Sequence, residues 1–86
     1  MQVSIEITLA PLHDDYEESI KSFIRLLRAS EFQVIENALS TQIFGEFSSL
    51  MPFLESAISE CFSSLEAGMI HLKIVKSNRS NYVPFD

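Results

Sequence analysis

The stretch VSIEITLAP, residues 3–11, alternates apolar and polar side chains without interruption. A period of two residues is typical of a β-strand with one buried face. We predict a strand over Val3–Ala10, ended by Pro11, which has no N–H group to give to a sheet. The face expected in the core carries Val3, Ile5, Ile7 and Leu9, and the opposite face carries Ser4, Glu6 and Thr8. The fold must therefore bury the first face, and the function of the second face has to be explained.

Two segments have the spacing of amphipathic helices. The first helix is predicted over Asp15–Ala29, with Asp14 or Asp15 as its cap, Glu17 or Glu18 three residues on, and basic residues at its end. Its apolar stripe is Tyr16, Ile20, Phe23, Ile24 and Leu27. The second helix is predicted to begin at Ser48 or Ser49, with Pro52 in its first turn and Gly68 just after its end. Its stripe is Leu50, Leu54, Ala57, Ile58, Cys61, Phe62 and Leu65.

Three further strands complete the pattern. Residues 32–46 are rich in β-branched and aromatic residues, and we predict the strands Phe32–Glu36 and Leu39–Glu46 with a turn at Asn37. A last strand is predicted over Met69–Lys76. The order β-α-β-β-α-β predicts an α+β ferredoxin-like sandwich with both helices on one face of a four-stranded antiparallel sheet, whose first and third strands are central. Residues 1–76 would form the domain and residues 77–86 a polar, then aromatic, tail.

Composition narrows the function classes. The chain has 86 residues, a net charge of −6 and only six Lys and Arg, so a nucleic-acid or anionic-membrane surface is not expected. No apolar run approaches the ~20 residues of a membrane span. Cys61 is the single cysteine, and we interpret it as a core residue, since no disulfide and no Cys/His zinc spacing are available. The strand pattern begins almost at Met1, so we expect no signal peptide and a cytoplasmic location. We also expect no metal and no cofactor.

The uncovered face of the sheet is the candidate functional surface. In addition to the polar residues of the first strand, it is predicted to carry Ser40, Gln42, Phe44, Met69, His71, Lys73 and Val75, and Ile35 if Val34 is buried. A solvated face is one interpretation. Several large apolar side chains favour instead a cover, most simply a second subunit in a homodimer or homotetramer. Polar groups would then line a crevice at the interface, where small ligands often bind. Glu6 is either a solvated strand residue or, if the face is covered, in need of a cation, for which Lys73 is the intrachain candidate.

Several segments together resemble the YkoF-like thiamine-binding family. They are ITLAPL (residues 7–12), DYEESI (15–20), TQIFGE (41–46), a Phe-bearing helix and GMIHLKI (68–74). The resemblance covers the chain from about residue 5 to residue 75. The resemblance implies a ferredoxin-like fold, no catalysis, and binding of thiamine or its hydroxymethylpyrimidine part by dimers or tetramers. Pro11, Thr41 and Gly45 match the family pattern by position.

The residues can be matched to the chemistry of thiamine. We expect Glu6 to neutralise the thiazolium cation and Phe44 to add a cation–π contact. Ser4, Thr8, Ser40, Thr41, Gln42 and His71 complete the predicted ligand-binding set. Other interpretations stay open: an interaction or regulatory domain that oligomerises through the sheet face without a ligand, and an enzyme with His71 or His13 as base. An RNA-recognition module is not favoured, because this chain lacks the basic residues that such a module needs. A copper chaperone and an acylphosphatase are not favoured either, because this chain lacks their characteristic loop after the first strand.

Overall fold

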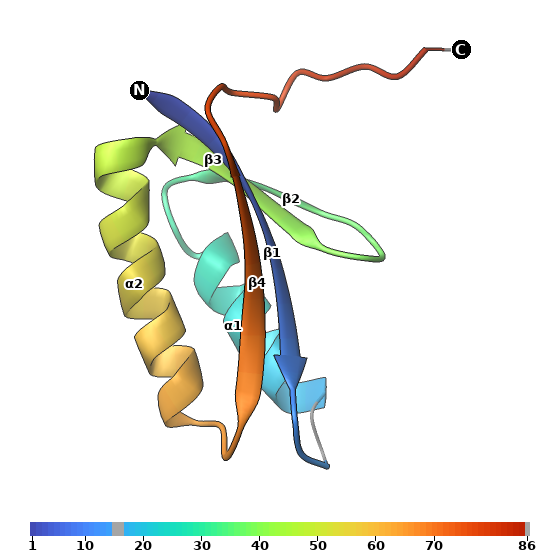
Figure 1. The fold of residues 1–86 in the computed structure, drawn as a ribbon, viewed down its shortest axis with the longest axis vertical. Helices are drawn as coiled ribbons and strands as arrows, with labels where there is room; N and C mark the ends of the chain where they lie inside the picture. The colour runs from blue at the N-terminus through green and yellow to red at the C-terminus, as the bar shows by residue number, and fades with distance from the viewer. Residues whose placement is uncertain (15–16, 86) are drawn as a thin grey trace.

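The computed structural model describes residues 1–14 and 17–85. The elements are β1 (Gln2–Pro11), α1 (Glu17–Arg28), β2 (Gln33–Glu36), β3 (Thr41–Glu46), α2 (Phe47–Ser63) and β4 (Gly68–Val75). All four strands form one antiparallel sheet in the order β2-β3-β1-β4, with both helices against one face (Figure 1). The predicted ferredoxin-like α+β fold is confirmed. Within the described ranges, no helix is both long and apolar enough to cross a bilayer.

The register of β1 fixes which side chains face the helices. Ile5 lies opposite Ile43 of β3 and Ile74 of β4, and Glu6 lies opposite Gln42 and Lys73. Because side chains alternate along a strand, the odd-numbered residues of β1 enter the core and the even-numbered residues face away from the helices. The buried core is Val3, Ile5, Ile7, Phe23, Leu27, Ile43, Leu50, Leu54, Ala57 and Cys61. The predicted faces of β1 are therefore correct, and so is Cys61 in the core.

Helix α1 agrees with its sequence signals. Glu17 and Glu18 lie in its first turn, Arg25 and Arg28 lie in its last turn, and Phe23 and Leu27 are buried. Charges of these signs at these ends favour the helix dipole. The predicted first residue Asp15, its role as a cap and the place of Tyr16 in the stripe lie outside the described residues.

The predicted start of α2 is wrong. The helix begins at Phe47, directly after β3, and Glu46 at its N-cap makes no side-chain capping hydrogen bond. The N–H of Phe47 donates instead to the carbonyl of Met1, 2.8 Å away, so strand pairing satisfies a donor that a serine was expected to satisfy. Pro52 consequently lies inside the helix rather than in its first turn, at an exposed position.

The end of α2 also differs from the prediction. Its C-cap is Ser64, whose N–H and hydroxyl both donate to the carbonyl of Cys61. Gly68 is not a helix cap but the first residue of β4, paired with Pro11. A Cβ at Gly68 would lie 2.9 Å from Leu65 Cδ1, so glycine permits a close approach there. Phe62, predicted in the buried stripe, is 44% exposed.

The strands also differ in detail from their predicted ranges. The Asn37 turn is confirmed, because Asn37 Oδ1 accepts hydrogen bonds from the N–H groups of Leu39 and Ser40. Leu39 belongs to this turn rather than to β3, and it is 88% exposed. Leu72 and Ile74, predicted on the core face of β4, are 40% and 45% exposed, because β4 is an edge strand that the helices only partly cover.

Candidate functional site

A cavity of about 160 Å³ lies on the sheet face that the helices leave open. Four of the predicted ligand-binding residues line it, namely Ser4, Glu6, Gln42 and Phe44, together with Ile5, Lys73, Val75 and Arg79. The central strands β1 and β3 supply the predicted residues, and β4 and the following segment supply the rest. The sequence therefore predicted correctly which of these polar side chains share the open face.

Glu6 is the acidic group of this open-face cavity. Its Oε2 accepts a hydrogen bond from the Ser40 hydroxyl at 3.0 Å, and its Oε1 lies 3.7 Å from Lys73 Nζ. Lys73, the intrachain candidate, is thus within ion-pair distance of Glu6. Arg79 also lines the cavity, so one acidic and two basic residues contribute to its walls. The carboxylate that was expected to meet a thiazolium cation already has a cationic neighbour.

Phe44 and Ser4, predicted as ligand-binding side chains on the open face, are buried. Phe44 is 3% exposed and Ser4 is 8% exposed within a single copy of the chain. Ser4 Oγ donates to the carbonyl of Ser77 and accepts the N–H of Arg79, so the segment after β4 folds back over this end of the sheet. Phe44 therefore packs beneath its own chain and does not present a free ring for stacking on a ligand.

Thr8 and His71 lie opposite each other on β1 and β4 and are both exposed. Neither residue lines the open-face cavity. His71 is also absent from the lining of the helix-side cavity described next, whereas Thr8 contributes to it. The prediction that His71 shares a site with Glu6 has no support in this geometry.

A second cavity, of about 220 Å³, lies on the helix side of the sheet between α1, β1 and the β2–β3 turn. We call it the helix-side cavity. Its lining is Ile7, Thr8, Leu9, Ile20, Phe23, Ile24, Asn37, Ala38, Leu39, Ser40 and Thr41. Among these residues, all from the described part of the chain, there is no Asp, Glu, Lys or Arg. The cavity therefore suits an uncharged group with apolar faces and a few hydrogen-bonding atoms.

Thr41 is the most deeply buried polar residue of the helix-side cavity. It is 8% exposed and forms part of the cavity wall. Thr41 and Gln42 were predicted in one ligand-binding set, but they lie on opposite sides of the sheet, because neighbouring residues of a strand point to opposite faces. The signal was present in the sequence: Ile43 was assigned to the core, and Thr41 is two residues before it.

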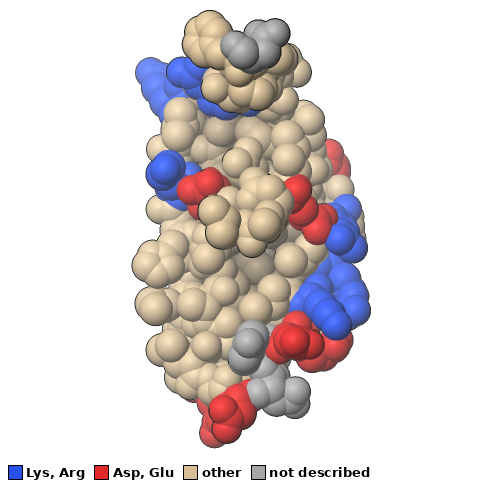
Figure 2. All heavy atoms as spheres, turned by 90° about the vertical axis from the view of Figure 1, so that its right-hand side faces the viewer, with Lys and Arg blue, Asp and Glu red and all other residues tan. Residues whose placement is uncertain are grey.

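The other charged groups do not gather into a further reactive site. Figure 2 shows Lys and Arg in separate groups on the side of the molecule it faces, without a continuous basic surface. Within residues 1–14 and 17–85, no three His, Cys, Asp or Glu side chains lie close enough together to hold a metal ion. Arg28 donates to both carboxylate oxygens of Glu36, and this bond lowers the pKa of Glu36. Burial raises the pKa of the Cys61 thiol, which makes it a poor nucleophile.

The comparisons with known proteins concern the fold. No family model and no curated protein matches the sequence. A Streptococcus pneumoniae protein of known structure is 24% identical, with a TM-score of 0.83 over 91% of this chain and 89% of that chain. A candidate thiamine biosynthesis/salvage protein from Thermotoga maritima is 18% identical, with a TM-score of 0.81 over 90% and 85%. A domain of unknown function from Bacillus cereus, DUF77, is 19% identical, with a TM-score of 0.76 over 96% and 83%. At these identities the likeness establishes a shared fold.

Proposed function

We propose that this chain is a non-catalytic binding protein for thiamine or its hydroxymethylpyrimidine part, with the pyrimidine ring in the helix-side cavity. The observation that carries the proposal is the helix-side cavity itself, whose described lining is apolar and uncharged apart from a few hydrogen-bonding groups, the buried Thr41 among them. Polar groups placed in a mostly apolar pocket orient a small ligand and give it specificity.

The chemistry of the ring fits this lining. An aminopyrimidine is flat and apolar on its two faces, and it carries hydrogen-bond donors and acceptors at its edge. Ile7, Ile20 and Phe23 offer apolar contacts to the faces, while Thr41 offers a hydroxyl to the edge. A site built to hydrogen-bond a ligand discriminates strongly against analogues that lack the matching group.

The size of the cavity fits a part of thiamine better than the whole molecule. A cavity of about 150 Å³ holds a benzene-sized ring, whereas pockets for drug-sized ligands begin at about 300 Å³. The helix-side cavity, at about 220 Å³, accommodates one substituted ring. The thiazolium ring of thiamine would then lie at the mouth, where the net charge of −6 of the protein favours a cation.

The open-face cavity is the alternative location for the ligand. A second copy of the chain, in a homodimer or homotetramer, would enlarge it and add polar groups. Ser4, Glu6, Gln42 and Phe44 would then form the site as the sequence analysis expects. The Lys73–Glu6 pair and Arg79 count against a cation at this place, because the cation would have to displace or approach like charges.

A calorimetric titration with thiamine and with free hydroxymethylpyrimidine tests the proposal. Thr41→Val keeps the shape of the side chain and removes the hydroxyl, and we expect it to weaken pyrimidine binding by roughly tenfold or more, as loss of a buried hydrogen bond does. Glu6→Gln serves as the matched control on the opposite face and should leave pyrimidine binding unchanged. Loss of binding in Glu6→Gln with normal binding in Thr41→Val would place the site on the open face. An absence of heat with wild-type protein for both ligands would reject the function itself.

A second candidate function is an assembly domain that uses the open face without a ligand. It is favoured by the exposure of Ile35, Met69 and Val75, which are 37%, 46% and 37% exposed on the open face of an 86-residue chain. Sedimentation equilibrium of wild-type protein and of Met69→Lys separates this function from the first, since an assembly through this face weakens in the variant whether or not thiamine binds.

A further inference from the structure

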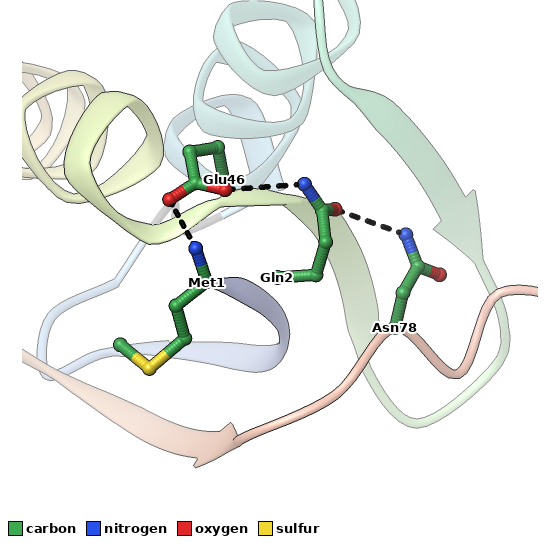
Figure 3. A network of polar contacts seen from close by, with 4 residues as sticks. All are labelled: Met1, Gln2, Glu46 and Asn78. Carbon is green, nitrogen blue, oxygen red and sulfur yellow. Dashed lines mark hydrogen bonds and ion pairs between the residues drawn. The ribbon is translucent and has the colours of Figure 1, made fainter.

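The segment after β4 has a fixed base. Ser77 and Arg79 share the Ser4 hydroxyl, and Asn78 Nδ2 donates to Gln2 Oε1 at 3.3 Å. Gln2 in turn donates to Glu46, which also pairs with the amino group of Met1, so the base is connected to the ends of β1 and β3 (Figure 3). Asn78 Oδ1 accepts both the N–H and the hydroxyl of Ser80, which shapes a turn. The direction in which the following residues leave the domain is therefore set by hydrogen bonds.

Residues 82–85, which we call the arm, make little contact with the rest of the chain. Tyr82, Val83 and Phe85 are 70%, 82% and 102% exposed. Three large apolar side chains in water on a segment with an ordered base are unfavourable unless something covers them. Figure 1 shows the arm leaving the top of the sheet on the side away from α2. In this arrangement the arm does not reach the apolar surfaces of its own domain.

An apolar groove lies between α2 and β4. Met51, Pro52, Leu54, Ile58 and Leu72 line it, with Glu55 as the single charged residue. Leu72 on its β4 wall is 40% exposed, and Ile74, two residues further along β4, is 45% exposed. Because β4 is hydrogen-bonded to β1 alone, its outer side also presents unpaired N–H and C=O groups. The groove thus offers both apolar contacts and a free strand edge to an extended segment.

We propose that the arm of one copy docks on the β4 edge of a second copy, as a short added strand whose side chains enter the α2–β4 groove. Val83 and Phe85 are two residues apart, so in an extended arm they point to the same face and contact Leu72 and Ile58 of the other copy. Tyr82 points to the opposite face, towards Met69. This pairing covers the exposed residues of the arm and of the groove at the same time.

Pro84 fits this arrangement between Val83 and Phe85. In an edge strand, alternate residues direct their N–H and C=O groups towards the neighbouring strand and the others direct them outward. Val83 and Phe85 pair with β4, and Pro84, which has no N–H, faces outward. A proline on the new outer edge prevents a further strand from adding, so the contact ends with the arm.

The occupant is a second copy rather than an unrelated peptide because the chain carries both halves of the contact. Each copy has one arm and one groove, and the arm points away from its own groove (Figure 1). Two copies that exchange arms form a closed pair, in which residue i of one copy meets residue j of the other and the reverse. This contact uses the β4 edge and does not depend on thiamine, on Thr41 or on the open-face cavity.

Sedimentation velocity of three proteins tests the proposal: the wild type, Phe85→Asp, and the control Leu39→Asp. Leu39 is 88% exposed at the β2–β3 turn, so its replacement removes a comparable apolar side chain away from the contact. We expect a dimer of the wild type and of Leu39→Asp, and a dissociation constant raised at least about tenfold in Phe85→Asp. A monomeric wild type, or a dimer that Phe85→Asp leaves unchanged, would overturn the proposal.

A mixing experiment confirms which residues meet. One preparation carries Leu72→Cys and the other carries Phe85→Cys, both in chains where the buried Cys61 is replaced by Ala. We expect a disulfide to form between the two different preparations after mixing and oxidation. A third preparation carries both substitutions in one chain. A disulfide that forms within this chain, with none between the first two preparations, would show that the arm folds back on its own domain and would contradict the exchange.

Discussion

The ring of Phe32 occupies the space that a side chain at residue 45 would need. A Cβ built on Gly45 would lie 2.7 Å from Phe32 Cδ1 and 3.1 Å from Cε1. The Phe32 ring also packs against Phe53 of α2, with the ring centroids 5.5 Å apart. Gly45 therefore allows a residue just before β2 to reach across β3 towards α2.

We expect Gly45→Ala to lower the free energy of unfolding by about 1–3 kcal/mol, the usual cost of overpacking. Urea denaturation measures this change. Phe32→Leu should relieve the clash, so that the double variant loses less stability than the sum of the two single variants. Strictly additive losses would show that Gly45 is required for its backbone and not for the Phe32 ring.

The sequence was sufficient for those parts of the fold that depend on periodicity. The alternation in β1 assigned Ile5 and Glu6 to their correct faces, and the charges at the ends of α1 were in place. The start of α2 could not be found in this way, because the capping signal of Ser48 is local whereas the bond that replaces a cap comes from Met1, at the other end of the chain. A hydrogen bond between residues far apart in the chain cannot be predicted from a local sequence pattern.

The candidate site was predictable only in part for the same reason. Glu6 and Gln42 share the open face because both follow from strand alternation. The burial of Ser4 and Phe44 depends on the segment after β4, which has no periodic pattern that could show where it docks. The helix-side cavity depends on how far α1 lies from the β2–β3 turn, and this distance is a property of packing.

Two residues of α2 that belong to the same predicted stripe should differ in their effect on stability. Leu54 is 1% exposed, so Leu54→Ala leaves a cavity and should cost about 2–5 kcal/mol. Phe62 is 44% exposed, and Phe62→Ala should cost about 1 kcal/mol or less. Denaturation of both variants checks the difference. Equal costs would mean that Phe62 is covered in solution, for example by another copy of the chain.

The base of the C-terminal segment should depend on one hydroxyl. Ser4→Ala removes the partner of the Ser77 carbonyl and of the Arg79 N–H, and we expect a loss of about 1–3 kcal/mol because buried groups are left unpaired. Hydrogen exchange should show a loss of protection at the Arg79 amide. Ser49→Ala, at an exposed position of α2, is the control and should change neither quantity. Unchanged protection at Arg79 in Ser4→Ala would contradict the fixed base.

Cys61 should react slowly with thiol reagents in the folded protein. It is 5% exposed in the core, and burial raises the pKa of its thiol, so both access and the thiolate fraction are reduced. With a disulfide reagent at about pH 8, we expect labelling to be at least tenfold slower than in the denatured chain, as is usual for a buried structural cysteine. Labelling at the denatured rate would show that α1 and α2 separate readily around this residue.

The ion pair between α1 and β2 should give stability a small dependence on acid pH. Arg28 Nε and Nη2 lie 2.5 and 2.7 Å from the two carboxylate oxygens of Glu36, and this contact lowers the pKa of Glu36 in the folded state. Folding therefore favours the ionised carboxylate. The contribution is fully present above the ordinary pKa of a glutamate and is lost as the pH falls through the lowered folded value.

Both the Arg28 and the Glu36 side chains are exposed, so the effect of this ion pair on stability is modest. We expect Glu36→Gln to be less stable than wild type at neutral pH, and the difference to shrink in acid as the wild-type carboxyl loses its charge. Urea denaturation of both proteins across this range measures it. Glu31→Gln is a suitable control, since Glu31 is exposed and takes no part in the contact between Arg28 and Glu36, and it should track wild type throughout. A gap between Glu36→Gln and wild type that persists undiminished in acid would mean that the bond between α1 and β2 does not depend on charge.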